Sequence, residues 1–416
     1  MKKRQVVRKI TSCRVCNGKK LVKVLSLGST PLANAFLKKE QLDLPEQYFP
    51  LDVYFCNDCS MLQLGHVVSQ EILFGNYVYV SSTSPVFVKH FQDFAKDVFQ
   101  KFKLNNKSFI IDIGSNDGIL LKPFKELGAK VLGVEPAVKI AKIAQKDGIK
   151  TLPYFFNLAL AKKIVKERGK ANVVTATNVF AHIDDLDEVI KGLQILLEDD
   201  GIFIIEAPYL VDFIQKRYFD LVYHEHLSYW SVTTLIKLFK RFEMKVFNAE
   251  RVNSHGGSIR VFVSKLNSRH RLENKVKKFV NEEERTKLSD VLTYFKYGKL
   301  VLQNKMELSS LLIKLKLNNK AIVGYGAPAK GNTLLNYFKI GQEILDYVID
   351  DSPLKQGLST PGTHIPVVSS LKLQTDNPDY VLILAWNFAK PIIEKLSAYR
   401  KAGGKFIIPV PKPLII

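Results

Sequence analysis

The sequence of 416 residues has few cysteines, a shortage of acidic residues and no long apolar run. None of its apolar stretches is long enough to cross a bilayer as a helix, and its basic first residues are not followed by the apolar stretch of a signal peptide. We therefore expect a cytoplasmic protein that makes no membrane contact. The apolar fraction of 46% and the length suit an ordinary globular chain of two or three domains.

Acidic residues are scarce because 40 Asp and Glu stand against 61 Lys and Arg, which gives a formal net charge of +21. Such an excess favours a phosphate-bearing partner: nucleic acid, an anionic membrane surface or a small phosphorylated substrate. The charge does not choose among the three. Many lysines stand singly on the outer faces of expected helices, so a solvated, lysine-rich surface accounts for the excess equally well.

The only four cysteines form two CxxC pairs, Cys13 with Cys16 and Cys56 with Cys59. In a cytoplasmic chain this spacing is typical of a structural zinc site, because four thiolates complete a closed tetrahedral shell. Disulfides or a redox pair are the alternatives. A closed shell leaves no open position for catalysis, so we expect the zinc to hold together an N-terminal β-type domain of residues 1–75.

An apolar strand from residue 109, a turn with two glycines that ends at Gly118 and the start of a helix at residues 119–121 follow one another. Bare backbone at such a turn can approach a ligand, and Glu135 at the end of the next strand can accept the hydroxyls of a ribose. An NAD site is the alternative, but Asp117 would repel a pyrophosphate, whereas S-adenosylmethionine (SAM) carries no phosphate. We therefore predict a SAM site in a domain of residues 76–270, formed by Asp112, Gly114, Ser115, Asn116, Gly118, Glu135, Pro136, Phe156 and Asn178.

The segment Tyr223–Tyr229 brings two imidazoles, a carboxylate and two phenols together. His224 and His226 are two residues apart and cannot share one helix face, as a zinc protease requires. On a strand or tight turn both would point the same way, with Glu225 opposite. A pair of surface histidines is the alternative. Two residues that follow other strands, His182 and Glu206, are further candidates for contact with a ligand.

A second strand-turn-helix unit begins at residue 321 in the expected C-terminal domain, residues 318–416. Lys330 and the backbone N–H groups at the start of its helix suit an anion. Residues 271–317 have apolar residues at helical spacing, which predicts a helical linker. The expected fold is α/β, with an N-terminal zinc-binding β module, a class I SAM methyltransferase Rossmann-like domain and a smaller Rossmann-like C-terminal domain.

Several blocks in this order resemble the zinc-containing SAM-dependent C-methyltransferases that act on nucleotide-linked 4-keto-deoxysugars. The resemblance spans the whole chain, and Asp112 stands where we expect Glu in many members. The blocks are the two CxxC pairs and residues 77–82, 114–118, 178–182, 223–226, 255–260 and 324–331.

The resemblance implies C-methylation at C-3 of a nucleotide-linked 4-keto-6-deoxysugar through an enolate, in the biosynthesis of a branched-chain deoxysugar. It assigns the general base to His226. It implies orienting or enolate-stabilising roles for Tyr223, Glu225, His182, Tyr77 and Tyr79. It implies substrate contacts for Ser81, Ser82, His224, Gly326, Ala327, Lys330 and Asn332.

The expected partner is a small nucleotide sugar, without nucleic acid or membrane, for a monomer or homodimer. A zinc-containing methyltransferase that acts on RNA or protein is the alternative function. Against it, the basic residues are dispersed and the N-terminal module lacks an arginine-aromatic stripe. A zinc-binding scaffold without activity would leave the SAM turn and the Tyr-His-Glu-His cluster unexplained.

Overall fold

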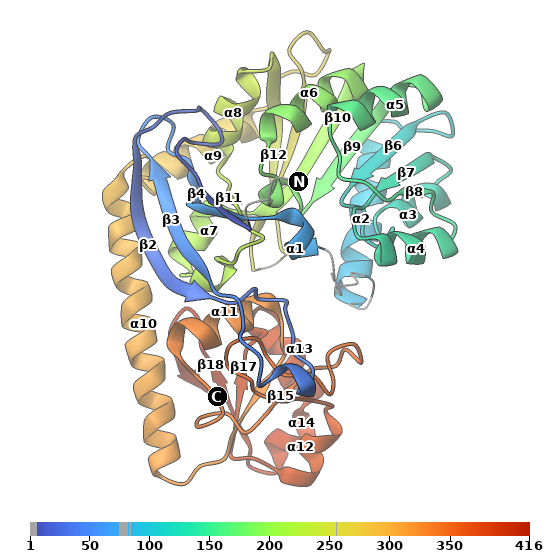
Figure 1. The fold of residues 1–416 in the computed structure, drawn as a ribbon. Coiled ribbons are helices and arrows are strands. Elements are labelled where there is room, and N and C mark those ends of the chain that lie inside the picture. Colours follow the sequence, from blue (N-terminus) through green and yellow to red (C-terminus); the bar gives the residue numbers. More distant parts are fainter. Residues whose placement is uncertain (1–5, 75–81, 83–84, 255) are drawn as a thin grey trace.

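The computed structural model describes residues 6–74, 82, 85–254 and 256–416 (Figure 1). Its described strands form four β-sheets of two, four, seven and six strands. The six-stranded sheet of the C-terminal part lies below the seven-stranded sheet in the view of Figure 1, and the four-stranded N-terminal sheet runs along one side. None of the described helices has the length and apolar character needed to cross a membrane.

The N-terminal sheet contains a strand from the middle of the chain. Its order is β11-β4-β3-β2, and β11 (Ser228–Tyr229) belongs to the Tyr-His-Glu-His segment. The aromatic and β-branched residues of 48–55 predict a strand, which is confirmed as β3. Residues 26–36 are rich in turn-forming residues and predict a turn, but this stretch begins inside β2. Gly28, at φ +80°, allows β2 to continue past an irregular register there. The other elements are β1 (Val7–Lys9), β2 (Leu21–Thr30), η1 (Lys39–Gln41), β3 (Phe49–Cys56), β4 (Leu62–Leu64), β5 (His66–Val68) and α1 (Gln70–Phe74).

The seven-stranded sheet has the order β12-β13-β10-β9-β6-β7-β8, with β13 antiparallel to both of its neighbours and the other pairs parallel. Its strands are β6 (Phe109–Ile113), β7 (Lys130–Val134), β8 (Thr151–Leu152), β9 (Ala171–Thr177), β10 (Leu197–Pro208), β12 (Met244–Val252) and β13 (Ser258–Lys265). Successive side chains of a strand point to opposite faces of the sheet, and these strands are apolar on both. Helices therefore cover both faces.

Helices α5, α6 and α8 cover one face of this sheet, and α2 and α3 cover the other. The helical spacing of Phe91, Phe94, Val98 and Phe102 predicts an amphipathic helix, and Phe91 and Phe94 are indeed buried on α2. The helices are α2 (Pro85–Lys101), α3 (Leu121–Glu126), α4 (Val138–Lys146), α5 (Leu158–Arg168), η3 (Phe180–His182), α6 (Leu186–Leu196), α7 (Leu210–Gln215), η4 (Phe219–Leu221) and α8 (Val232–Lys240).

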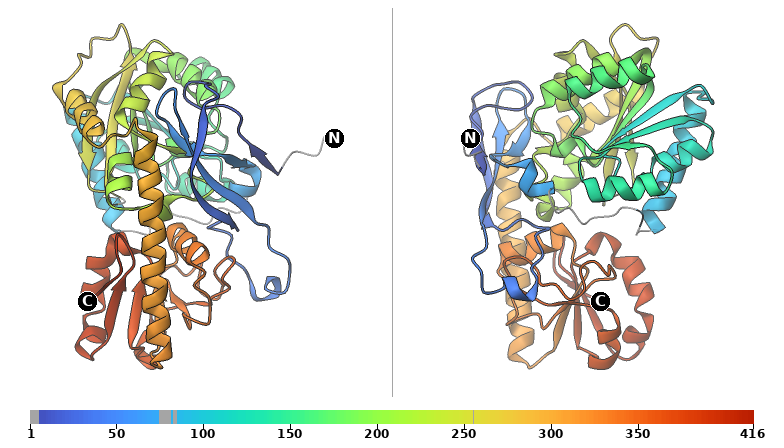
Figure 2. Two further views of the ribbon diagram at one scale, coloured as in Figure 1. Left: turned by 90° about the vertical axis from the view of Figure 1, so that its left-hand side faces the viewer. Right: turned by 45° about the vertical axis from the view of Figure 1, so that its right-hand side comes forward.

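The expected helical linker consists of α9 (Asn274–Arg285) and α10 (Val291–Leu317). Helix α9 packs against β12 and α8, whereas α10 passes β2 and continues along the C-terminal part (Figure 2). The buried face of α10 carries Tyr294, Tyr297 and Val301, while Leu302 and Met306 are exposed. The two helices of the linker therefore contact the N-terminal, middle and C-terminal parts of the chain.

The C-terminal sheet has the order β16-β15-β14-β17-β18-β19, parallel except for β19. A short run of parallel strands alternating with helices is the expected Rossmann-like unit. Its elements are β14 (Ile322–Tyr325), α11 (Ala329–Phe338), β15 (Val348–Ile349), β16 (Val367–Val368), α12 (Leu371–Asp376), β17 (Tyr380–Ile383), η5 (Trp386–Phe388), α13 (Ala389–Lys395), α14 (Ser397–Lys401), β18 (Lys405–Ile408) and β19 (Leu414–Ile415).

Candidate active site

The four cysteine sulfurs converge, because all four Sγ atoms lie within 4.8 Å of one another. Cys13 Sγ is 3.5 Å from Cys59 Sγ, and Cys16 Sγ is 3.7 Å from Cys56 Sγ. Sulfurs at about 2.3 Å from a tetrahedral zinc would lie about 3.8 Å apart. Backbone N–H groups two residues after Cys13 and Cys16 also point at those sulfurs, at 3.4 Å. The donor set and its spacing fit one zinc ion.

The turn after β6 has the backbone conformation that its glycines were expected to provide. Gly114 has φ +69° and Gly118 has φ +80°. A Cβ atom on Gly114 would lie 2.3 Å from a methyl group of Val179, so the turn leaves no room for a side chain there. The backbone therefore passes close to the carboxyl end of β9, where a ligand binds in open α/β sheets.

Glu135 lies at the carboxyl end of β7 and ties the turn down. Its two carboxylate oxygens accept hydrogen bonds from the N–H groups of Asn116, at 3.0 Å, and Ala137, at 2.8 Å. Burial raises the pKa of Glu135, although both N–H groups oppose the shift. Asp112 lies deeper, accepts the Thr175 hydroxyl at 2.6 Å, and has its pKa raised by burial to about 7. These contacts fit a supporting role for Asp112.

Other residues expected at the SAM site surround this end of the sheet. Asn178 follows β9 with φ +56°, and its N–H donates to the Glu206 carbonyl at 2.7 Å. Phe156 is buried, and its ring packs against the backbone of Gly192 in α6. Ser115 is buried within the turn, and Pro136 directly follows Glu135.

The Tyr-His-Glu-His segment is a tight turn, closed by a hydrogen bond from the N–H of His226 to the carbonyl of Tyr223 at 2.8 Å. His224 is buried, with Nε2 at 3.1 Å from the Phe49 carbonyl in β3. His226 instead faces the Tyr223 ring, at 3.9 Å between centroids. The expectation that both histidines point the same way on a strand or tight turn is therefore wrong, because only an extended strand places residues two apart on one side, and this turn does not.

The carboxylate of Glu225 also contacts the N-terminal part, since it accepts a hydrogen bond from Asn34 Nδ2 at 2.7 Å. Glu225 is buried, and burial raises its pKa to about 7 even though the bond from Asn34 lowers it. His224 and Glu225 thus fasten the turn to the N-terminal part, while Tyr223 and His226 remain half-buried.

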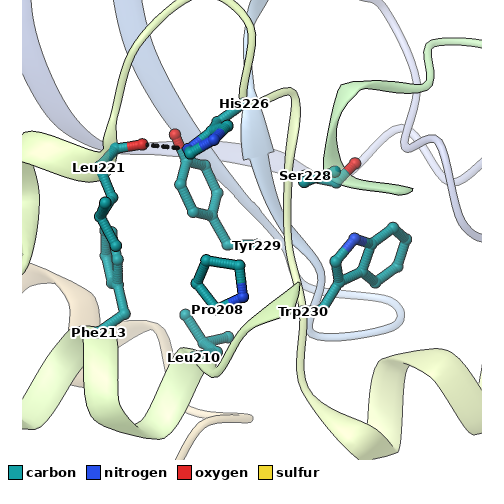
Figure 3. A pocket seen from close by; sticks show the side chains of 9 residues that line it. Pro208, Leu210, Phe213, Leu221, His226, Ser228, Tyr229 and Trp230 are labelled. Carbon is teal, nitrogen blue, oxygen red and sulfur yellow. Dashed lines mark hydrogen bonds between the residues drawn. The ribbon is translucent and has the colours of Figure 1, made fainter. Parts of the chain in front are cut away.

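His226 has a defined ring orientation. Its Nδ1 lies 2.7 Å from the carbonyl oxygen of Leu221, as the dashed line in Figure 3 shows. A carbonyl only accepts hydrogen bonds, so Nδ1 carries the proton and Nε2 is the basic nitrogen of the neutral ring. The ring of His182 lies 5.1 Å away between centroids, and burial lowers the pKa of His182 to about 4. His182 is therefore neutral near pH 7.

A small pocket opens beside His226 (Figure 3). Its walls are mostly apolar and come from η3, α7 and the segment from η4 through β11. An apolar wall next to an imidazole strengthens electrostatic interactions there, because water is excluded. The lining residues are Ala181, Pro208, Leu210, Phe213, Leu221, His226, Ser228, Tyr229 and Trp230.

A known C-methyltransferase matches this chain over nearly its full length. The chain is 35% identical over 411 residues to the C-methyltransferase NovU of Streptomyces niveus, and the match covers 99% of this chain and 98% of the relative. Three family models match consecutive segments: a zinc-binding domain at residues 13–74, a methyltransferase domain at 87–248 and a C-methyltransferase C-terminal domain at 253–411.

The chain belongs to the zinc-binding C-methyltransferase family.

More distant relatives match the middle of the chain. A ubiquinone biosynthesis O-methyltransferase of Pelagibacter ubique is 22% identical over 162 residues, which is 38% of this chain and 65% of the relative. The structure of magnesium protoporphyrin IX methyltransferase from Synechocystis PCC 6803 with bound SAH covers 43% of this chain and 83% of its own, at 15% identity and a TM-score of 0.35.

This C-methyltransferase uses SAM as its cofactor and carries a zinc site in its N-terminal domain, as the sequence predicted. The class I SAM methyltransferase fold is likewise confirmed. The cysteine sulfurs would hold the zinc. Glu135 and the backbone of residues 114–118 would hold SAM.

In the C-methyltransferase, Glu206 forms a buried network instead of facing a ligand. Its carboxylate accepts hydrogen bonds from Arg260, at 2.9 and 3.1 Å, and from the Ser254 hydroxyl at 3.0 Å, and lies 2.6 Å from His90 Nε2. Burial acts to raise the pKa of Glu206, but His90 and Arg260 outweigh it and hold that pKa at about 2. Glu206 therefore stays ionised and links α2 to the segment before β13.

The residues expected to bind substrate in the C-terminal part lie at the turn between β14 and α11. Gly326 has φ +83°, and the N–H of Ala327 donates to Asp350 at 2.7 Å. Asn332 donates to the Ala33 carbonyl at 2.7 Å and so joins this turn to the N-terminal part. The ammonium group of Lys330 is buried, 3.9 Å from the centroid of the Trp386 ring.

The sequence did not predict a role for Asp220, the acidic group near Lys330. Asp220 is fully buried in η4 and accepts a hydrogen bond from the Trp386 indole N–H. Burial raises the pKa of Asp220 and lowers that of Lys330, and the attraction between the two charges opposes both shifts. An acid directly after two aromatic residues, Tyr218 and Phe219, was the available signal. Asn34, the partner of Glu225, was hidden in a stretch expected to be a turn.

Three predicted residues, Tyr77, Tyr79 and Ser81, lie outside the described residues, and Ser82 is exposed. Their roles remain predictions.

Proposed function

We propose that this SAM-dependent C-methyltransferase methylates a carbon next to the ketone of a nucleotide-linked 4-keto-6-deoxysugar, at C-3, with His226 as the base. The full-length relatedness to a C-methyltransferase supports carbon as the acceptor atom. The nucleotide-sugar substrate rests on the family resemblance and on the site chemistry below.

The contact between His226 Nδ1 and the Leu221 carbonyl, at 2.7 Å, carries the proposal. It leaves Nε2 as the nitrogen that takes up a proton, and the half-buried ring gives substrate a route to it. A C–H bond next to a ketone is acidic only when the developing enolate oxygen is stabilised as the proton leaves.

The neighbours of His226 suit that second requirement. The Tyr223 phenol lies against its ring, and His182 is neutral near pH 7 because burial lowers its pKa. A neutral His182 can donate one hydrogen bond without adding a positive charge next to the base. Glu225, whose pKa burial raises to about 7, is part-protonated at neutral pH and fixes the turn through Asn34.

The proton balance follows from these roles. Bound SAM supplies an electrophilic methyl group. His226 takes the proton from the carbon next to the ketone, and the electron pair of that C–H bond is delocalised onto the ketone oxygen. The same pair then forms the new carbon-carbon bond to the methyl group as the methyl-sulfur bond breaks. The electron pair of that bond stays on sulfur, S-adenosylhomocysteine leaves, and His226 releases its proton to water.

The turn between β14 and α11 supports a phosphate-bearing substrate. Lys355 lies 3.3 Å from Asp350 and donates to the Ala327 carbonyl at 2.9 Å. Two lysines, Lys330 and Lys355, lie at this turn, each with a carboxylate nearby, Asp220 and Asp350, whereas the turn of the SAM site has the carboxylates of Asp112 and Glu135. A nucleotide would therefore bind in the C-terminal part, and its sugar would reach His226 at the junction with the middle part.

Incubation with SAM and a panel of nucleotide-linked 4-keto-6-deoxyhexoses tests the proposal directly. A product heavier by one methyl group, with the new carbon at C-3 in its NMR spectrum, is the expected result. Methyl transfer to oxygen, or transfer only to RNA or protein, would contradict it.

A further inference from the structure

Arg14 lies inside the first zinc knuckle, between Cys13 and Cys16, and its side chain is only 4% exposed. Its Nη1 donates to the Leu64 carbonyl at 2.9 Å and to the side-chain oxygen of Gln63 at 3.2 Å. These contacts fix the guanidinium group against β4.

The other contacts of the guanidinium group reach both histidine segments. Nη1 is 3.4 Å from the carbonyl oxygen of Leu227, the residue after His226. Nε is 3.5 Å from Asp184 Oδ1, two residues after His182. The N–H of Leu64 also donates to the Leu227 carbonyl, at 3.0 Å. The same carbonyl oxygen therefore accepts hydrogen bonds from the knuckle and from β4.

Burial of a guanidinium group costs free energy unless its donors are paired, and an apolar side chain would fill this space at lower cost. The planar group of arginine nevertheless has a fixed geometry that neither lysine nor an apolar residue can reproduce. In Arg14 the hydrogen bonds come from Nη1, and Nε faces the Asp184 carboxylate without a hydrogen bond. Arg14 thus contacts two segments, at Asp184 and Leu227, that are 43 residues apart in sequence and whose histidine rings lie 5.1 Å apart.

We infer that Arg14 is a positioning residue, through which the zinc knuckle holds the His182 and His226 segments in the geometry that the reaction needs. The zinc domain would then set the orientation of the base in addition to its own stability. The kinetic part of the test rests on the proposed role of His226, whereas the spectroscopic part does not.

The test variant is Arg14→Met, which keeps an unbranched side chain but removes the donors. Arg241→Met is the matched control, because Arg241 also joins this knuckle to the chain after His182, through the Val15 carbonyl and Asp187 of α6, but lacks the bond that Arg14 makes to the Leu227 carbonyl. Asp184→Asn weakens the ion pair without touching the knuckle. Zinc content and SAM affinity should equal those of the wild type in the variants compared.

The ¹⁵N spectrum of the imidazoles, recorded without substrate or SAM, reports the tautomer of His226 directly. In the wild type we expect Nδ1 protonated and Nε2 unprotonated. Arg14→Met should mix the two tautomers, and Arg14→Lys and Asp184→Asn should do so less. An unchanged His226 signal in Arg14→Met, or an equal change in Arg241→Met, would overturn the inference.

The kinetic arm uses the 4-keto-6-deoxyhexose nucleotide that gives product. Arg14→Met should lower kcat on the order of 10-fold to 100-fold, the cost of misplacing a reacting group by about 1 Å, while the KM for SAM stays unchanged.

If His226→Asn loses activity and Arg14→Met does not, the positioning role is wrong and the proposed function stands. If His226→Asn retains activity while Arg14→Met alters the tautomer, the proposed base is wrong instead. If Arg14→Met loses its zinc, Asp184→Asn decides: no change in its tautomer would overturn the inference.

Discussion

Tyr223 and His226 are half-buried and face each other, whereas His224 and Glu225, which lie between them in sequence, are buried against the N-terminal part. One four-residue turn therefore holds two pairs with different surroundings. The buried pair bonds to Phe49 and Asn34 from the zinc domain, and the half-buried pair lies beside the apolar pocket. The buried pair therefore ties the turn to the zinc domain, and the proposed function assigns the chemistry to the half-buried pair, Tyr223 and His226.

The largest effect should come from removing the zinc domain's hold on the turn. Cys56→Ser takes one thiolate from a four-thiolate site, and binding of structural zinc contributes on the order of 10 kcal/mol in small zinc domains. We expect loss of zinc by metal analysis and a large drop in the melting temperature. Stoichiometric zinc in the variant would show that the four sulfurs are not its ligands.

The next effect concerns the half-buried pair. His226→Asn should lower kcat by roughly two to four orders of magnitude, the usual contribution of a positioned base, with SAM affinity near that of the wild type. Steady-state kinetics and calorimetry measure the two quantities. An equal loss in His224→Gln would erase the distinction between the two pairs.

His224 should instead affect how the free energy of unfolding changes in acid. Burial lowers its pKa to about 4 from an ordinary value near 6.5, so only the unfolded chain takes up this proton as the pH falls through 6.5. His224 therefore costs stability progressively between about pH 6.5 and pH 4, by up to about 3 kcal/mol.

His224→Gln can still donate to the Phe49 carbonyl but cannot take up that proton. Its free energy of unfolding should fall less than that of the wild type between pH 7 and pH 4.5, by on the order of 2 kcal/mol. The other buried acids and histidines are present in both proteins and cancel in the comparison. Parallel pH profiles from denaturant titrations would contradict the buried role of His224.

The smallest effect concerns Glu135, which lies outside the Tyr223–His226 turn and serves as a control for the variants of that turn. Glu135→Ala removes the carboxylate that holds the turn after β6, so SAM affinity should weaken by about 1–3 kcal/mol, the range for charge-assisted hydrogen bonds. Exchange of the sugar proton, which needs only the half-buried pair, should persist. Unchanged SAM affinity by calorimetry would remove Glu135 from the SAM site.

Local patterns in the sequence predicted much of this structure. The CxxC pairs, the glycines of the turn after β6 and Glu135 are determined by chemistry within a few residues, and the structure brings each set together. The N-terminal sheet was different, because its fourth strand, β11, comes from residue 228 and no local pattern reports such a distant partner.

Long-range contacts also explain what the sequence did not reveal about the site. Asn34, Asp220 and Arg14 acquire their roles from partners more than 150 residues away. Helix α10 shows the same limit, since its apolar residues occur on two faces and spacing alone does not say which face is buried. The residues around His224 and His226 were equally compatible with a strand and with a tight turn. The sequence therefore could not show that the two histidines have different surroundings.

The central claim, that His226 removes the proton next to the ketone, is tested most directly by proton exchange without SAM. The 4-keto-6-deoxyhexose nucleotide that gives product is incubated in deuterated water with wild type, His226→Asn and His224→Gln, and deuterium at the methylated carbon is followed by NMR. We predict exchange with the wild type and His224→Gln and none above background with His226→Asn. Exchange by His226→Asn at the wild-type rate would show that another residue is the base.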